Sequence, residues 1–145
     1  MSKRTIAIGS DHAGPPLKEM LKAELERREF TVLDLGAHGA DSVDYPDFGR
    51  AVGEAVASGQ AECGIVICGT GIGISIAANR IAGVRCAVCH DVTSARLARE
   101  HNDANVMALG IRMIGTEVAL DCLDAFITTA FSGGERHVRR IEKLR

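Results

Sequence analysis

The sequence has few aromatic residues and almost no excess of charge of either sign. Aromatic residues make up 3% of the 145 residues and tryptophan is absent, so we expect no surface on which nucleic-acid bases stack. The formal net charge is −2, which argues against a bulk electrostatic attraction to nucleic acid. We therefore expect no nucleic-acid partner.

Long apolar runs are also missing. No run approaches the roughly 20 residues that a membrane-spanning helix requires. The first residues, Met1 to Arg4, lead directly into a short strand-like segment, so we expect no signal peptide. Five cysteines, an odd number without a secretory signal, indicate free thiols rather than a disulfide framework. We expect a cytoplasmic protein that does not bind membranes.

The usual motifs of metal, nucleotide and serine-hydrolase sites do not occur. The five histidines are scattered without an H-x-x-x-H pair, so we expect no metal. The patterns G-x-G-x-x-G, G-x-x-x-x-G-K and G-x-S-x-G are absent. The segment 86–90 matches the haem-attachment pattern C-x-x-C-H, but a strand there would point Cys86 and Cys89 to opposite faces. We interpret them as core cysteines.

Strand-like and helix-like segments alternate along the whole chain. The length suits one α/β domain better than two. The predicted strands are 5–9, 30–35, 64–67, 84–88 and 105–109, each followed by apolar residues at helical spacing or by a polar turn. This alternation predicts one domain, residues 1–145, of the α/β class. We expect a Rossmann-like, five-stranded parallel sheet between two layers of helices, followed by a C-terminal helical tail.

The economical strand order for such a sheet is the flavodoxin-type order 2-1-3-4-5. Ligands then bind beyond the carboxyl ends of the strands, where the order reverses between the first and third strands. Ser10-Asp11-His12 follows the first strand and Cys68-Gly69-Thr70 follows the third. The topology therefore predicts that these two polar clusters lie together.

The segment 68–75 places a thiol at the end of a buried strand and three glycines in the turn into a helix. Glycine lets the backbone approach a ligand, and a helix N-terminus offers unpaired N–H groups that favour an anion. The same environment favours the thiolate form of cysteine. We interpret Cys68 as a reactive cysteine beside an anion-binding turn, although a glycine turn before a helix is often only structural.

Three other polar groups have both a functional and a structural interpretation. Asp11 and His12 could be a helix cap and a surface histidine, and His101-Asn102-Asp103 could be a polar helix end. Arg136 and Arg140 lie one helical turn apart, so both can face one anion. The alternative for these arginines is a solvated basic tail.

Several stretches of the chain resemble ribose-5-phosphate isomerase type B, within the RpiB/LacA/LacB sugar-phosphate isomerases. They are Gly9–Gly14, Asp44–Pro46, Ile67–Asn79 and His101–Val106. The segment 133–137 is similar to the tail of the family, with one inserted residue. The resemblance extends over nearly the whole chain.

The resemblance implies cofactor-free interconversion of ribose 5-phosphate and ribulose 5-phosphate through an enediol, in the non-oxidative branch of the pentose phosphate pathway. Cys68 would be the base that moves a proton between two sugar carbons. Thr70 would bind the reacting oxygens, and His101 with Asp11 would open the furanose ring. The other implied substrate contacts are the backbone N–H groups of Gly69, Gly71, Ile72 and Gly73, and the side chains of His12, Asn102, Arg112, Arg136 and Arg140. A six-carbon sugar phosphate, such as allose or galactose 6-phosphate, is the alternative substrate, and a non-catalytic phosphosugar-binding module is the alternative class.

The position of His101 has a consequence for assembly. It ends a helix that returns to the amino edge of the sheet, whereas Cys68 lies at the carboxyl edge, about 17–20 Å away across a strand of five or six residues. We therefore expect His101, Asn102 and the tail, residues 133–145, to reach the pocket of a neighbouring subunit. The expected assembly is a homodimer with composite sites. The sequence does not decide whether dimers pair into tetramers, or whether Arg112 acts in the site of its own subunit or in that of the neighbouring subunit.

Overall fold

The structure is a computed structural model, and it describes residues 4–145 of the chain. The helices and strands alternate as the sequence predicts. They are β1 (Thr5–Ser10), α1 (Pro15–Arg27), β2 (Thr31–Asp34), α2 (Tyr45–Ala57), β3 (Cys63–Cys68), α3 (Ile72–Asn79), β4 (Cys86–Val88), α4 (Val92–Asn102), β5 (Val106–Gly110), α5 (Thr116–Thr128) and α6 (Glu135–Glu142). Residues 1–3, on which the expectation about a signal peptide partly depends, lie outside the described part.

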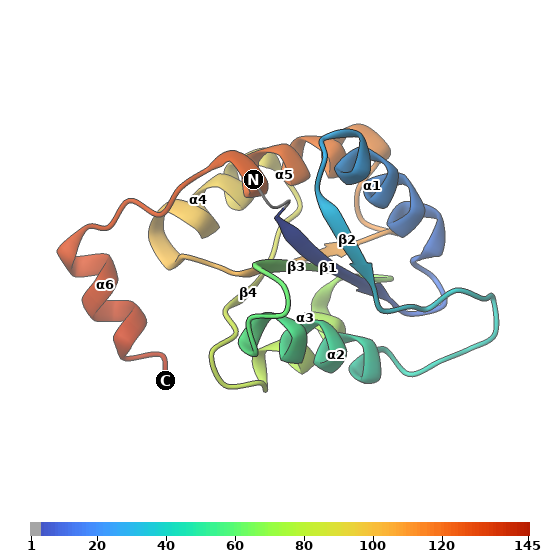
Figure 1. The fold of residues 1–145 in the computed structure, drawn as a ribbon, viewed down its shortest axis with the longest axis horizontal. Coiled ribbons are helices and arrows are strands. Elements are labelled where there is room, and N and C mark those ends of the chain that lie inside the picture. Colours follow the sequence, from blue (N-terminus) through green and yellow to red (C-terminus); the bar gives the residue numbers. More distant parts are fainter. Residues whose placement is uncertain (1–3) are drawn as a thin grey trace.

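The five strands form one parallel sheet with a layer of helices on each face. Figure 1 shows α1, α4 and α5 on one face and α2 and α3 on the other, while α6 stands apart from both layers. The predicted α/β class, the parallel sheet and the helical tail are thus confirmed. Within residues 4–145, no helix has both the length and the apolar character needed to cross a bilayer.

The predicted strand order is wrong at one edge of the sheet. The observed order is β2-β1-β3-β5-β4, so the last two strands exchange places relative to 2-1-3-4-5. Every residue of β5 is buried, whereas the three residues of β4 are only partly buried. A strand that is apolar on both faces belongs inside a parallel sheet, and a short, half-covered strand belongs at its edge. The reversal between β1 and β3, which positions the site, is as predicted.

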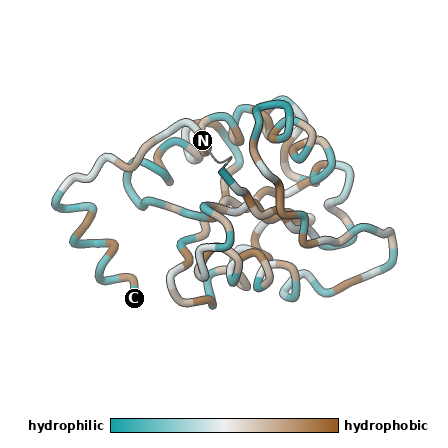
Figure 2. The backbone as a smooth tube through the Cα atoms, viewed as in Figure 1, coloured by the Kyte–Doolittle hydropathy of each residue, from teal (hydrophilic) through white to brown (hydrophobic). Residues whose placement is uncertain are grey.

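Alternation along the strands sends side chains to two separate cores. Ile65 and Ile67 of β3 pack in the core beneath α1, α4 and α5, whereas Val66 and Cys68 pack in the core beneath α2 and α3. Figure 2 shows hydrophobic residues concentrated along the central strands. The side chain of Cys68 therefore faces the layer that contains α3, the helix that follows the glycine turn.

The C-x-x-C-H segment contributes to both cores. Cys86 packs against the core beneath α2 and α3, and Cys89 is buried in the core on the other face. Burial raises the pKa of both thiols, that of Cys89 to about 12. All five cysteines are unpaired. The interpretation of these residues as free core cysteines is confirmed.

The C-terminal helix α6 has no buried residue. Figure 2 shows hydrophilic and hydrophobic residues alternating around its turns, and Val138 and the following Leu144 are exposed. Its clearest side-chain contact with the rest of the chain is with α4, where the rings of His101 and His137 stack at a centroid distance of 4.6 Å. The tail is therefore an amphipathic helix whose apolar side chains remain largely uncovered within one chain.

Candidate functional site

The ends of β1 and β3 meet at the point where the strand order reverses. Ser10 pairs with Ile67 in the register of the sheet, and the backbone N–H of Asp11 donates to the carbonyl oxygen of Ile67 at 3.1 Å. The polar cluster that follows β1 thus lies beside Cys68, as the topology predicts.

Cys68 is the last residue of β3, and its sulfur lies at the start of α3. The backbone N–H of Gly71 donates a hydrogen bond to Cys68 Sγ at 3.1 Å. An N–H donor at a helix N-terminus stabilises negative charge on sulfur. Cys68 is only 5% exposed, so this thiol is almost entirely buried in the single chain.

The backbone of the glycine turn permits no side chain at Gly71. This residue is the N-cap of α3 and has a φ of +79°. A Cβ atom built on it would lie 2.9 Å from the carbonyl carbon of Leu109, which is backbone and cannot easily move away. Glycine at this position therefore brings the turn into contact with β5 and aims the Gly71 amide at the sulfur.

Two larger side chains lie directly against the same turn. A Cβ atom on Gly73 would fall 2.6 Å from ring carbons of Tyr45, and one on Gly69 would fall 3.1 Å from Nη1 of Arg112. The backbone N–H of Arg112 also donates to the carbonyl oxygen of Gly69 at 3.0 Å. The guanidinium of Arg112 thus lies at the glycine turn of its own chain.

Asp11 and His12 are both held by backbone groups. Asp11 Oδ1 accepts from the N–H of Ala13 at 2.9 Å, which closes a tight turn before α1. His12 Nδ1 accepts from the N–H of Val43 at 3.1 Å, so the ring proton of a neutral imidazole is on Nε2. The interpretation of Asp11 as a helix cap is wrong, because Gly14 is the N-cap of α1 and no side chain caps this helix. The position of Asp11 beside β3 agrees with its functional interpretation.

His101 and Asn102 lie at the opposite edge of the sheet from Cys68. They end α4, which leads into the amino end of β5 at Val106, whereas Cys68 pairs with Gly110 at the other end of that strand. At about 3.3 Å per residue, β5 separates these edges by roughly 13 Å. One chain therefore does not bring His101 and Cys68 together.

Arg136 and Arg140 lie on α6 and are exposed. Within residues 4–145 neither guanidinium has an ion-pair partner. Partial burial, together with the nearby charges of His101, Arg136 and Arg140, holds the pKa of His137 below its ordinary value. The guanidiniums of Arg136 and Arg140 therefore lie close enough to the stacked His101 and His137 rings to influence the titration of His137.

Two residues that contact the turn were not predicted. Tyr45 packs on Gly73 and stands in the Asp44–Pro46 motif at the start of α2. This motif contributed to the family resemblance, but no function was predicted for Tyr45. His90 Nε2 lies 3.3 Å from the carbonyl oxygen of Thr70. Its only sequence signal was the end of the C-x-x-C-H pattern, which indicated nothing about the glycine turn.

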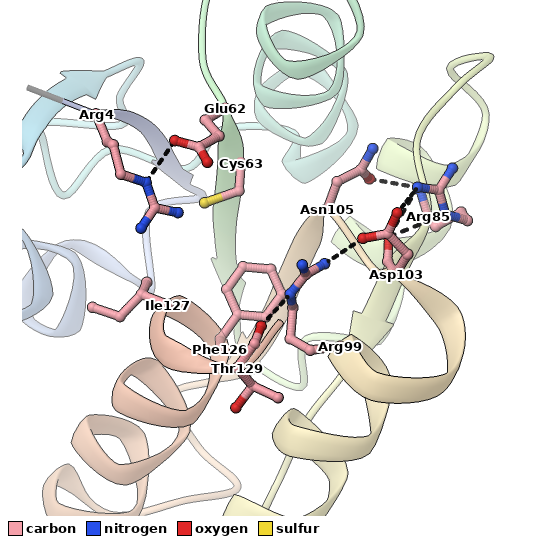
Figure 3. Close-up of a pocket in the computed structure, with 10 residues that line it drawn as sticks. All are labelled: Arg4, Glu62, Cys63, Arg85, Arg99, Asp103, Asn105, Phe126, Ile127 and Thr129. Carbon is pink, nitrogen blue, oxygen red and sulfur yellow. Dashed lines mark hydrogen bonds and ion pairs between the residues drawn. The ribbon is translucent and has the colours of Figure 1, made fainter. Parts of the chain in front are cut away.

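A cavity of about 320 Å³ lies at the amino edge of the sheet, away from these residues (Figure 3). Its arginines are already paired: Arg4 Nε donates to Glu62 at 2.6 Å, and Arg99 Nη1 donates to Asp103 at 2.9 Å. None of the predicted catalytic residues lines it. The first pair joins the starts of β1 and β3, and the second links the last turn of α4 to its C-cap, so both have a structural role.

The fold and the site together define a class: an open parallel α/β protein that presents a thiol and a glycine turn at its topological switch point. The sequence model of the ribose/galactose isomerase family matches residues 6–144. The chain belongs to this family.

Individual relatives match over almost their whole length. The chain is 46% identical to a putative sugar phosphate isomerase of Bacillus subtilis, with 96% of this chain and 93% of that protein covered. It is 45% identical to ribose-5-phosphate isomerase B of Escherichia coli, with 97% and 94% covered. The solved structure of ribose-5-phosphate isomerase B from Clostridium thermocellum superposes with a TM-score of 0.95 at 54% identity, covering 97% of this chain and 94% of that one.

Proposed function

We propose that the chain is an aldose–ketose isomerase that interconverts ribose 5-phosphate and ribulose 5-phosphate through an enediol, without a cofactor. The observation that carries the proposal is the hydrogen bond from the Gly71 amide to the sulfur of Cys68. It gives a strand-end thiol the environment of a base in a chain that is 45% identical to the Escherichia coli isomerase. We place the enzyme in the cytoplasm, and the five unpaired thiols support this location.

In this proposal Cys68 removes the proton from one sugar carbon and returns it to the next. The thiolate is the active form, and the Gly71 amide stabilises it. Proton removal places negative charge on the neighbouring oxygen, which needs hydrogen-bond donors that are already in position. The intermediate is the neutral or singly ionised enediol. The proton of the carbon-2 hydroxyl passes to the carbon-1 oxygen, and delivery of the Cys68 proton to carbon 1 then gives the ketose.

The glycine turn supplies the donors for that oxygen. The Gly71 amide is occupied by the sulfur and the Ile72 amide donates to Thr70 Oγ1 at 3.1 Å. Gly73 lies in the first turn of α3, where the N–H groups have no acceptor within the helix. We assign the backbone N–H groups of Gly73 and Gly69 as the donors to the enediolate oxygen. The hydroxyl of Thr70 is assigned as the donor to the adjacent oxygen. Loss of one such donor costs about 2.7–4 kcal/mol of transition-state stabilisation.

The remaining groups complete the site across a homodimer. Asp11, His12 and Arg112 come from the chain that contributes Cys68, and His101, Asn102, Arg136 and Arg140 come from its partner. His101 opens the furanose ring together with Asp11, and the arginines bind the phosphate. Two features of one chain support this arrangement: the distance between the edges of the sheet, and the uncovered apolar side chains of α6.

Proton exchange at carbon 2 of ribose 5-phosphate in deuterated water tests the chemistry. Wild type is expected to exchange and isomerise, and Cys68→Ala to lose at least a hundredfold in kcat, the lower end of the effect of a general base. Cys63→Ala is the matched control, because Cys63 begins the same strand and burial raises its pKa to about 11. Absence of turnover by wild type with any pentose or hexose phosphate would instead favour the phosphosugar-binding module.

Complementation tests the composite site. Cys68→Ala and His101→Ala homodimers are each expected to be inactive, whereas a mixture allowed to exchange subunits regains up to a quarter of wild-type activity, because half of the mixed dimers' sites are intact. A fully active isolated monomer contradicts the composite site. Since the family description includes galactose as well as ribose isomerases, the same preparations are assayed with six-carbon sugar phosphates.

A further inference from the structure

A charged pair is buried between α1 and the end of β2. The ammonium of Lys18 lies 2.7 Å from Asp34 Oδ1 and 2.9 Å from Oδ2. The Lys18 side chain is fully buried, and that of Asp34 is 9% exposed. A buried lysine is costly unless it is paired, and removing one partner leaves the other charge uncompensated. The proposed reaction uses neither residue.

Other charged and titratable groups surround this pair without replacing it. Glu19 Oε1 and His38 Nδ1 each lie 3.4 Å from the Lys18 ammonium, and the Lys22 ammonium lies 3.4 Å from Asp34 Oδ2. Ligand atoms of Glu19, Asp34 and His38 come within 4.8 Å of one another. The lysine already supplies the positive charge between them, so this group is an ion-pair cluster rather than a metal site.

The carboxylate of Asp34 also binds the segment 35–44, which connects β2 to α2. Asp34 Oδ1 accepts from the N–H of Gly36 at 3.0 Å. The carbonyl oxygen of Gly36 accepts from the N–H of Ser10 at 2.6 Å, and the N–H of Ala37 donates to the carbonyl oxygen of Ser10 at 2.7 Å. The ion pair therefore fixes the first part of this segment against the residue that immediately precedes Asp11 and His12.

The far end of the same segment holds the ring of His12. The N–H of Val43 donates to His12 Nδ1, and Tyr45, two residues later, packs on Gly73. Asp11 has an independent anchor, because its N–H donates to the carbonyl oxygen of Ile67 on β3. Displacement of the segment 35–44 would thus release His12 and leave the backbone of Asp11 in place.

We propose that Lys18 is a positioning residue: through Asp34 it holds the segment 35–44 where Val43 fixes the orientation of the His12 ring. The inference rests on the proposed function for the statement that His12 contacts the sugar phosphate. Because the proposed base, Cys68, and the backbone of Asp11 do not depend on this segment, loss of Lys18 changes substrate binding more than the chemical step.

The kinetic test uses Lys18→Met, which keeps the length of the side chain and removes its charge. We expect its KM for ribose 5-phosphate to rise at least fivefold while kcat changes less than threefold. Lys22→Met is the matched control, because Lys22 approaches the same carboxylate but is 31% exposed, and its KM should stay within twofold of wild type. Leu21→Ala removes a buried side chain of the same helix, and it should lower the Tm without changing KM.

A second readout does not depend on activity. In 15N NMR spectra, Lys18→Met is expected to shift the His12 Nδ1 resonance and to accelerate hydrogen exchange of the Val43 amide at least tenfold, with no change in Lys22→Met. If Lys18→Met does not fold, Asp34→Asn replaces it, because it removes the carboxylate nearest to the buried ammonium and leaves only that of Glu19 at 3.4 Å. The same changes are expected. Unchanged KM and unchanged Val43 exchange in the folded variant overturn the inference. An inactive wild type with the expected NMR changes contradicts the proposed function and leaves the positioning role of Lys18 supported.

Discussion

The ring of Tyr45 covers the backbone of Gly73 so closely that a methyl group on Gly73 would fall 2.6 Å from two ring carbons. Tyr45 begins α2 and Gly73 lies in the first turn of α3. The two residues therefore connect the segment after β2 with the turn that carries the proposed oxyanion donors. Tyr45 is 42% exposed, so it forms part of the surface around the candidate site.

Gly73→Ala is expected to lower kcat/KM by about a hundredfold, because the new methyl group must displace either the Tyr45 ring or the start of α3. A displacement of about 1 Å in a catalytic group has an effect of this size. Steady-state kinetics on the folded variant provide the measurement. Gly115→Ala is the control, since no atom lies within 4 Å of its Cβ position.

Tyr45→Ala in the Gly73→Ala background shows whether the new methyl group displaces the Tyr45 ring or the start of α3. It removes the clash, and at least part of the lost activity should return if the Tyr45 ring is what the methyl group displaces. A Gly73→Ala variant with wild-type kinetics would mean that the turn is not part of the site.

The sequence was sufficient to predict the geometry of this candidate site because local signals and topology agreed. An apolar strand, a thiol and three glycines before a helix predict the turn at Cys68, and any parallel sheet that starts with the order 2-1-3 brings Asp11 beside it. The contact of Tyr45 with Gly73 and that of His90 with Thr70 depend instead on how α2 and the end of β4 pack. Side-chain contacts between elements distant in sequence leave no local pattern.

The error in the predicted order of β4 and β5 has a similar explanation. The sequence of β4 contains the apolar run Cys86–Val88, so periodicity alone rates both strands as buried. Their order depends on which strand is covered on both faces. This strand is β5, because all five of its residues are buried. The burial of the Lys18–Asp34 pair could not be predicted from the sequence either, because a lysine between the apolar positions of a helix normally indicates a solvent-exposed face.

Acid titration should reveal the charge on Asp34. Burial, the largest influence, acts to raise the pKa of this carboxyl, but the hydrogen bonds from Lys18 and from the Gly36 amide outweigh it and hold the pKa below its ordinary value. A group with a lowered pKa stabilises the fold above its unfolded pKa, about 3.9, and this contribution disappears as the pH falls through the folded pKa.

The free energy of unfolding, measured with urea at a series of pH values below 5, is therefore expected to fall more steeply with decreasing pH in wild type than in Asp34→Asn. Asp41→Asn is the control, because Asp41 lies in the exposed part of the neighbouring segment and should leave the slope unchanged. Equal slopes in wild type and Asp34→Asn would show that the carboxyl is not stabilised by its partners.

The titration of His137 reports the charges around the end of α6. Partial burial is the largest cause of its lowered pKa, and the positive charges of His101, Arg136 and Arg140 add to it. Arg140→Gln removes one of these charges and is expected to raise the pKa of His137, as measured by NMR titration of the ring. Arg139→Gln is the matched control, because Arg139 is not among the groups that lower this pKa. A shift of equal size in both variants would indicate a general effect of net charge.

Arg140 also tests the proposed phosphate site. A charge-assisted hydrogen bond contributes about 1.5–3 kcal/mol, so Arg140→Ala is expected to raise KM for ribose 5-phosphate by roughly 10- to 100-fold, whereas Arg139→Ala, about 100° away around the helix, should change it little. Unphosphorylated ribose separates the possible causes, since it lacks the group that Arg140 would bind. Any slow turnover of ribose should be equal in wild type and Arg140→Ala. If the substitution slows ribose and ribose 5-phosphate equally, Arg140 acts on the assembly of the site and not on the phosphate.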